Sequence, residues 1–259
     1  MHGQGTWGKE DQAQIVPQAP KVNLSRTTLL LTRPEAASHR FAEQVARQVG
    51  RFREVVISPV MEIVPVAADL LGAEEAEWIF TSANAVERSP QPGKGAAAWC
   101  VGPHTAEAAR RAGFDLRAVA PDAASLRDLI RADPPGRPML HAAGRHRRGG
   151  LAAALRASGI AARAVTVYDQ RACPLTEAAL RRLGQPGDVV APVFSPRSAR
   201  LLCDAAAGRV ARITAVAISP AAAAGWKPVD AESVIVAENP DATGMLAAIN
   251  SLFDADRSA

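Results

Sequence analysis

From residue 28 onward the chain alternates short apolar runs with alanine-rich stretches that have helical periodicity. Residues 28–32 (TLLLT) form a compact apolar run, which is typical of a buried parallel strand. After Pro34, apolar side chains recur at every fourth position from Phe41 to Val49, and this spacing predicts a helix that ends at Gly50.

The same alternation continues to the end of the chain. Further strands are expected at residues 55–59, 78–81, 99–102, 138–141, 164–168, 189–194, 213–219 and 234–237, and further helices at 105–112, 122–132, 151–158 and after residue 241. Strands that alternate with helices of this length predict βαβ units and parallel sheets, hence an α/β fold.

Some elements carry more specific expectations. Asp122 is expected to cap the helix at 122–132, with an apolar face made of Leu126, Leu129 and Ile130. Asp241 is expected to cap the last helix, whose inward-facing residues would be Met245, Leu246, Ile249 and Leu252. Residues 164–168 are rich in β-branched side chains and favour an exposed ladder strand, whereas Pro192 argues against a central position for residues 189–194.

Short motifs recur in the two halves of the chain. Phe80–Ser82 before an expected helix resembles Phe194–Pro196 before another, and Pro121–Asp122 resembles Pro240–Asp241. The matches come in the same order in both halves, so the sequence predicts two similar α/β units.

Composition narrows the class of protein. The 259 residues are 48% hydrophobic and 22% charged, which suits one large or two ordinary globular domains. The three cysteines (Cys100, Cys173, Cys203) are widely spaced without a CxxC, and the five histidines form no HxxxH pair, so we expect a reducing compartment and no metal site. Residues 1–26 are polar and lack the apolar core of a signal peptide, so we expect an extra arm and a cytoplasmic protein.

Charge indicates the kind of partner. The net charge is +4, which favours an anionic ligand. Aromatic residues make up only 4% of the chain and no basic run exceeds two residues, so a nucleic-acid platform is not expected. The chain also lacks an apolar run long enough to span a bilayer, so no membrane partner is expected.

Four expected strand-to-helix turns carry small polar residues: 81–84 (TSAN), 102–105 (GPHT), 195–198 (SPRS) and 219–222 (SPAA). The carboxyl ends of parallel strands meet at one sheet edge, where helix N-termini present free N–H groups that suit carboxylates or phosphates. The alternative is that each Ser or Thr only caps its helix.

Arginines stand near such turns, notably Arg33, Arg145 and Arg197, and arginine pairs well with carboxylates. The alternative is that these arginines only form part of a solvent-exposed surface, as is expected in an arginine-rich chain. Residues 141–150 are basic and glycine-rich, but they match neither a P-loop nor GxGxxG. The sequence also lacks GxSxG and any catalytic Cys–His signature.

Several of these segments, in this order, resemble the uroporphyrinogen-III synthase family. They are 31–34 (LTRP), 58–59 (SP), 80–86 (FTSANAV), 101–106 (VGPHTA), 140–144 (LHAAG), 167–168 (VY), 194–196 (FSP) and 217–220 (AISP), and the resemblance covers about residues 28–252.

The resemblance implies two flavodoxin-like α/β domains with parallel sheets, joined by a two-stranded β-ladder. The first domain would combine residues 27–54 and 172–259, the second would span 66–162, and the linker strands would be 55–65 and 163–171. It also implies a monomeric, cofactor-free enzyme that cyclises the anionic linear tetrapyrrole hydroxymethylbilane to uroporphyrinogen III with inversion of ring D and loss of water. Hydroxymethylbilane synthase would be the substrate donor.

The resemblance also assigns roles to residues. Tyr168 becomes the candidate catalytic group, helping the hydroxyl to depart. The substrate-binding candidates, taken together with those of the turns, are Arg33, Thr81, Ser82, Asn84, Thr105, Arg145, Ser195, Arg197, Ser219 and Ala221.

One departure from the family pattern leaves alternatives open. Ala221 and Ala222 stand where the family often has threonines, so a hydroxyl that would bind a carboxylate is missing. A catalytically impaired homologue that binds a tetrapyrrole is therefore the second interpretation, and an unrelated two-lobed ligand-binding protein is the third.

Overall fold

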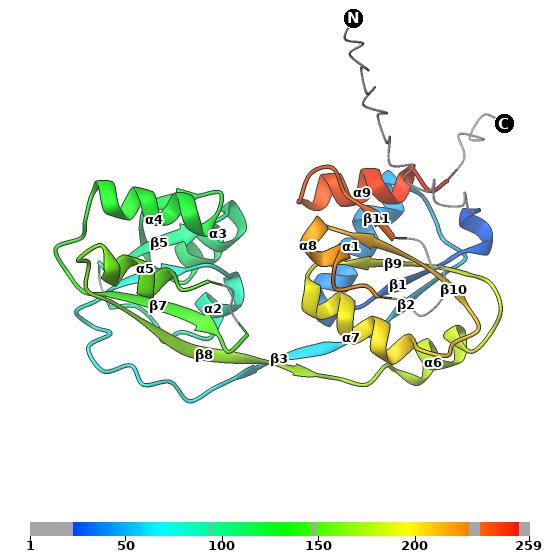
Figure 1. Ribbon diagram of the computed structural model, residues 1–259, viewed down its shortest axis with the longest axis horizontal. Coiled ribbons are helices and arrows are strands. Elements are labelled where there is room, and N and C mark those ends of the chain that lie inside the picture. Colours follow the sequence, from blue (N-terminus) through cyan, green and yellow to red (C-terminus); the bar gives the residue numbers. More distant parts are fainter. Residues whose placement is uncertain (1–22, 94, 147–148, 228–233, 254–259) are drawn as a thin grey trace, which may run out of the picture. The chain divides into compact units, whose positions relative to one another are not determined.

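The computed structural model describes residues 23–93, 95–146, 149–227 and 234–253. The chain divides into two compact units, one made of Met1–Pro59 and Leu175–Ala259 and the other of Val60–Pro174. We call them the five-stranded unit and the six-stranded unit after their sheets (Figure 1). Most of the expected arm at residues 1–26 lies outside the described residues, but its end forms a short 3-10 helix, Leu24–Arg26, and Leu24 packs against the core of the five-stranded unit.

The five-stranded unit has a fully parallel sheet in the order β11-β10-β9-β1-β2. Its strands are β1 (Thr28–Leu31), β2 (Glu54–Ile57), β9 (Asp188–Val193), β10 (Arg212–Ala217) and β11 (Val234–Val236). Its helices are α1 (Glu35–Gln48), α6 (Glu177–Leu183), α7 (Pro196–Ala206), α8 (Pro220–Ala223) and α9 (Ala242–Asn250).

Alternate residues of β1 face opposite sides of this sheet. Leu29 and Leu31 join a core with residues of α1 and α9, including Phe41 and Met245. Leu30 is also buried, as are apolar residues of α6 and α7 such as Leu183. A strand that is buried on both faces explains the continuous apolar run at residues 28–32.

The six-stranded unit has a sheet in the order β3-β8-β7-β4-β5-β6. Its strands are β3 (Met61–Pro65), β4 (Glu77–Phe80), β5 (Ala97–Val101), β6 (Asp115–Ala120), β7 (Met139–Gly144) and β8 (Ala162–Ala172), and all pairs are parallel except β3 with β8. Its helices are α2 (Ala83–Glu87), α3 (Pro103–Arg111), α4 (Ala123–Ala132) and α5 (Leu151–Ala157).

Two separate cores cover the two faces of this sheet. On one face Trp78, Phe80 and Phe114 make mutual ring contacts and pack with residues of α2 and α3. On the other face residues such as Ile79 and Trp99 pack with α4 and α5. The sheet therefore lies between helical layers, as an α/β fold requires.

The segment expected as one linker strand, residues 55–65, contains two strands. Residues 54–57 pair in parallel with β1, whereas Met61–Pro65 pair antiparallel with the end of β8. Ser58 and Pro59 separate them, and proline has no N–H to continue a ladder.

Three details differ from the expectations. Leu126 and Ile130 of α4 are fully buried, but Leu129 is 44% exposed, because the helix turns it away from the sheet. Residues 164–168 belong to an internal strand, and Val165 and Val167 are buried, since β8 has β7 on one side and β3 on the other.

The third difference is β9, which is the central strand of its sheet although it contains Pro192. Its ladder with β1 ends at Val190, before the proline, and only β10 pairs alongside Pro192. The ladder therefore loses little from the missing N–H.

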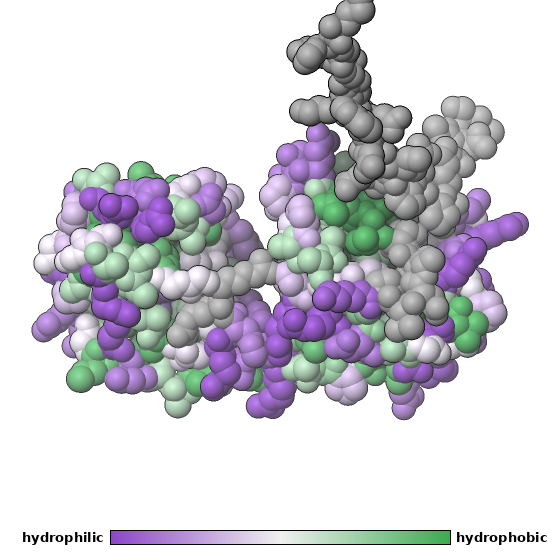
Figure 2. Space-filling view, in the orientation of Figure 1, coloured by the Kyte–Doolittle hydropathy of each residue, from purple (hydrophilic) through white to green (hydrophobic). Residues whose placement is uncertain are grey.

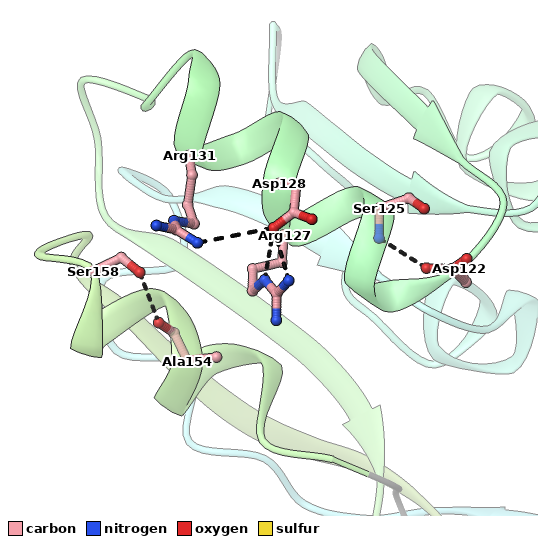
Figure 3. Close-up of polar contacts among 7 residues, drawn as sticks. All are labelled: Asp122, Ser125, Arg127, Asp128, Arg131, Ala154 and Ser158. Carbon is pink, nitrogen blue, oxygen red and sulfur yellow. Dashed lines mark hydrogen bonds and ion pairs between the residues drawn. The ribbon is translucent and has the colours of Figure 1, made fainter.

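Several helix starts follow the expected capping chemistry. The Asp122 carboxylate accepts a hydrogen bond from the N–H of Ser125 at 2.8 Å (Figure 3), and that of Asp241 accepts one from Gly244. The residues expected to face inward in the last helix are all buried, although Leu252 lies just beyond the end of α9. On the visible face of each unit, hydrophilic residues are interspersed with apolar ones (Figure 2), and none of the described helices has the length and apolar character that a membrane crossing needs.

Candidate functional site

In the six-stranded unit the predicted site residues follow three adjacent strands, and one more lies on the neighbouring strand β8. The turn after β4 carries Thr81 and Ser82, and helix α2, which follows it, carries Asn84. The helix after β5 carries Thr105, and the turn after β7 carries Arg145. Strands β8, β7, β4 and β5 are neighbours and parallel, so these turns lie along one sheet edge. We call this set, with Tyr168 on β8, the polar row of the six-stranded unit.

The side chain of Thr81 contacts a buried histidine on the neighbouring strand β7. Its hydroxyl shares a 3.2 Å hydrogen bond with Nε2 of His141 on β7, whose side chain is only 5% exposed. The bond fixes the rotamer of the threonine, which reaches the surface in part. His141 carried no expected role, and its partner is distant in the sequence.

The neighbouring turns combine caps with backbone donors. The Ser82 hydroxyl accepts a bond from the N–H of Asn84 at 3.2 Å and caps α2. At the next turn Gly102 has φ +78°, a conformation that favours glycine, and Pro103 begins α3. Thr105 lies in the first turn of α3 and is buried. Both the capping and the ligand-binding interpretation fit these contacts.

Arg145 lies in an ion cluster at the end of β7. Its Nε lies 3.0 Å from Oδ2 of Asp169, and Nε2 of His146 lies 3.4 Å from Oδ1 of the same carboxylate. The Arg145 N–H also donates to the carbonyl of Tyr168 at 2.9 Å. The positive charge of Arg145 is therefore partly neutralised by Asp169. Through the same ion pair Asp169 connects the turn after β7 to strand β8.

Tyr168 has its ring against the end of β7. The residue is 6% exposed, and its hydroxyl makes no hydrogen bond with any residue that the structure describes. The ring lies over Gly144, where a side chain would collide with it. A phenol without a hydrogen-bond partner in the described part of the chain is available to a ligand that reaches it.

The five-stranded unit has a second row, on β1, β9 and β10. Arg33 follows β1, Ser195 and Arg197 follow β9, and Ser219 and Ala221 follow β10. These three strands are also adjacent and parallel, so their carboxyl ends share one edge.

Arg33 is the notable cation of that row. Its guanidinium carbon lies 4.3 Å from the centre of the Phe194 ring, which stacks edge-on against Phe41. Burial, together with the charge of Arg40, lowers the pKa of Arg33 from its usual value, although an arginine stays protonated at neutral pH. No carboxylate among the described residues forms an ion pair with Arg33, so the cation is suited to an anionic ligand.

The other members of this row are caps and their neighbours. Ser195 and Ser198 form a reciprocal capping box at the start of α7. Arg197 lies in the first turn of that helix and is half-buried. Ser219 accepts a 3.3 Å bond from the N–H of Ala222, and Ala221 is exposed. The serine cap is therefore present although Ala221 and Ala222 stand where the resemblance leads us to expect threonines.

Two cavities of about 340 and 370 Å³ lie elsewhere in the six-stranded unit, beside the first halves of β7 and β8. Both are lined by Arg156 and Arg163. These guanidinium groups donate to backbone carbonyls, Arg156 to Ala162 and Arg163 to Asp69. Since both cations already serve the fold, the rows are the better candidates. The described residues include no cluster of side chains able to hold a metal ion.

Sequence reasoning placed the turns on each edge but missed their supporting residues. His141, Asp169 and Phe194 each contact a candidate through tertiary structure. In the sequence His141 and Phe194 stand out only as members of the segments 140–144 and 194–196, and Asp169 only as the acid beside the single tyrosine.

Comparison with known proteins identifies the relatives of this chain. The family profile described as "Uroporphyrinogen-III synthase HemD" matches residues 41–247. No curated protein matches the chain. The solved uroporphyrinogen-III synthetase from Helicobacter pylori 26695 is 16% identical with a TM-score of 0.60, over 88% of this chain and 99% of that one. A mutant uroporphyrinogen III synthase from the extremely thermophilic bacterium Thermus thermophilus is 15% identical with a TM-score of 0.47, over 87% of this chain and 98% of that one. At such identities the Helicobacter structure establishes the shared fold.

Proposed function

The chain belongs to the uroporphyrinogen-III synthase family, and from this premise we propose that it cyclises hydroxymethylbilane to uroporphyrinogen III. In the proposed reaction the hydroxymethyl C–O bond breaks and the hydroxyl leaves as water after gaining a proton. The pyrrole nitrogen supplies the electron pair and gives an electrophilic azafulvene. The azafulvene methylene bonds to the substituted α-carbon of ring D and gives a spiro intermediate. The bond from that carbon to the methylene bridge of ring C then breaks and leaves a second azafulvene on ring C. Its methylene bonds to the other α-carbon of ring D, which loses its proton, so the macrocycle closes with ring D inverted. The enzyme is a hydro-lyase in this account.

The observation that carries the proposal is the alignment of polar groups along one edge of each sheet, where parallel strands end. Such an edge offers helix N-termini and arginines, both of which suit the carboxylates of a linear tetrapyrrole. Arg33, without an acidic partner among the described residues, is the strongest single cation for this role. In this proposal each row binds carboxylates of the substrate and holds the linear tetrapyrrole folded for ring closure. This lowers the entropic part of the barrier to cyclisation.

Tyr168 is the proposed proton or hydrogen-bond donor to the departing hydroxyl. Since its hydroxyl has no partner among the described residues, Tyr168→Phe removes no internal bond and should leave the free energy of unfolding nearly unchanged. Turnover should fall by about 10-fold or more, as expected for loss of a general acid. Unchanged turnover in a fully folded variant would remove Tyr168 from this role.

The decisive experiment supplies purified protein with hydroxymethylbilane made in place by hydroxymethylbilane synthase. The products are oxidised and their type I and type III isomers are separated by chromatography. We expect the type III isomer. Formation of type I alone, as without enzyme, would refute the proposal, and binding of the tetrapyrrole without isomer control would identify the impaired homologue.

The remaining proposals concern the setting of the reaction. We propose that the protein acts as a monomer in the cytoplasm, without metal or cofactor, and receives its substrate from hydroxymethylbilane synthase. Sedimentation at assay concentration tests the monomer. Direct transfer is tested by measuring the coupled rate at different ratios of the two enzymes while the concentration of free hydroxymethylbilane is held constant. A rate that depends on this ratio would indicate direct transfer.

A further inference from the structure

The pairing of β7 with β8 changes register beside Tyr168. Along the ladder Ala142 lies opposite Val165 and Ala143 opposite Thr166, but Gly144 lies opposite Tyr168, so Val167 is passed over. The shift breaks the alternation of β8, and Val167 and Tyr168 are both buried although they are consecutive. An extra residue in one strand redirects the side chains that follow it, and such irregularities often occur next to active sites.

Gly144 is the residue onto which Tyr168 is redirected. A Cβ at position 144 would lie 2.6 Å from Cε2 and Cζ of the tyrosine ring and 2.9 Å from its hydroxyl oxygen. The backbone of Gly144 does not have a positive φ, so its conformation is open to other residues. With the tyrosine ring in its present place there is no room for a side chain at position 144.

The hydroxyl end of the ring, rather than its base, occupies the space above Gly144. A methyl group there would displace the hydroxyl by turning the ring, while the backbone of β8 stays held by the bond from the N–H of Arg145 to the carbonyl of Tyr168. The register shift selects the face of the sheet, and Gly144 selects the position of the hydroxyl on that face.

We propose that Gly144 is a positioning residue for the reaction, because it and the register shift at Val167 together fix the place of the Tyr168 hydroxyl. The inference rests on the role proposed above for Tyr168. Gly144 itself touches no substrate in this account and acts only through the ring.

The first test needs no activity. Tyr168 is the only tyrosine of the chain, so protein labelled with ring-¹³C tyrosine gives the signals of one ring. Gly144→Ala should shift these ring signals. Gly136→Ala is the matched control, since a Cβ there would meet nothing within 4 Å and the glycine lies in the same unit. Ring signals equally unchanged in both variants would overturn the proposal.

The second test separates positioning from general damage. Gly144→Ala should lower kcat by about 10-fold or more, as for Tyr168→Phe, with a KM close to that of the parent. Gly144→Ala combined with Tyr168→Phe should be no slower than Tyr168→Phe alone, because the hydroxyl is already absent. Losses that multiply would overturn the proposal. Failure of the parent protein to form type III product would instead refute the proposed function, and the ring signals would still test the contact.

A folding control covers the case in which Gly144→Ala does not fold. Tyr168→Ala removes the ring, so Gly144→Ala in that background meets no collision and should melt at the temperature of Tyr168→Ala alone. If the double variant remains unfolded, the collision is not with the ring and the proposal fails.

Discussion

Glu77 is a buried carboxylate with partners inside the six-stranded unit, and we predict that it contributes to stability but not to the reaction. It begins β4, is 4% exposed, and its Oε2 accepts a hydrogen bond from Nε1 of Trp99 at 2.7 Å. Its Oε1 lies 3.4 Å from the guanidinium of Arg117. The residue is at the amino end of its strand, and Thr81 is four residues further on, about 13 Å away at the usual strand rise. Glu77 therefore lies at the edge of the sheet opposite the polar row.

Replacement of Glu77 by leucine would leave the Trp99 N–H buried without an acceptor. This costs about 1–3 kcal/mol, the usual penalty for an unpaired buried donor. The Arg117 side chain is 59% exposed and finds water instead, so its ion pair adds little. Glu77→Gln keeps an oxygen for Trp99 and loses only the charge, so it should cost about 1 kcal/mol.

Urea unfolding, followed by circular dichroism, measures these costs, with the synthase assay performed on the same preparations. Glu62→Gln serves as the control because its ion pair with Arg171 is exposed in the same unit, and it should change stability by less than about 0.5 kcal/mol. Glu77→Leu with Trp99→Phe removes donor and acceptor together and should recover part of the loss.

Two results would refute this reasoning. One is a Glu77→Leu protein as stable as the parent, which would mean that the Trp99 bond contributes nothing. The other is a fully folded Glu77→Gln protein with reduced kcat, which would give the carboxylate a part in the chemistry.

Three further predictions follow from charge and burial. Hydrogen bonds from Ser125, chiefly from its N–H, lower the pKa of Asp122. The contribution of Asp122 to stability is therefore complete above its unfolded pKa of about 3.9 and is lost as pH falls through the lower folded value. The difference in stability between the parent and Asp122→Asn should shrink in acid, and a constant difference from pH 7 to pH 2 would contradict this. Burial raises the pKa of Cys100 to about 11, against a smaller opposing effect of Arg110. A thiol reagent at pH 8 should therefore label Cys173 and Cys203 in the native protein, and Cys100 only after unfolding. Peptide mapping of the labelled protein checks this. Added salt should raise KM for hydroxymethylbilane, because screening weakens contacts between arginines and carboxylates, and a KM independent of ionic strength would exclude an electrostatic grip.

The candidate site shows how far sequence patterns reach. The turns after β4, β5, β9 and β10 were predictable, because a polar residue between an apolar run and an alanine-rich helix indicates a cap, and parallel strands bring such caps to one edge. Their partners were not predictable. The bond from Thr81 to His141 and the stacking of Arg33 on Phe194 join residues that are far apart in the chain.

The sequence by itself determined the α/β class, most of the strands and helices, and several of their caps, because periodicity and capping depend on neighbours within a turn or two. Only the tertiary structure decided that β9 is central despite Pro192, that Leu129 faces solvent, and that the Tyr168 ring lies on Gly144. These outcomes depend on which strands are adjacent and in what register. A shift of one residue moves a side chain to the other face of a sheet, and no local pattern specifies such a shift.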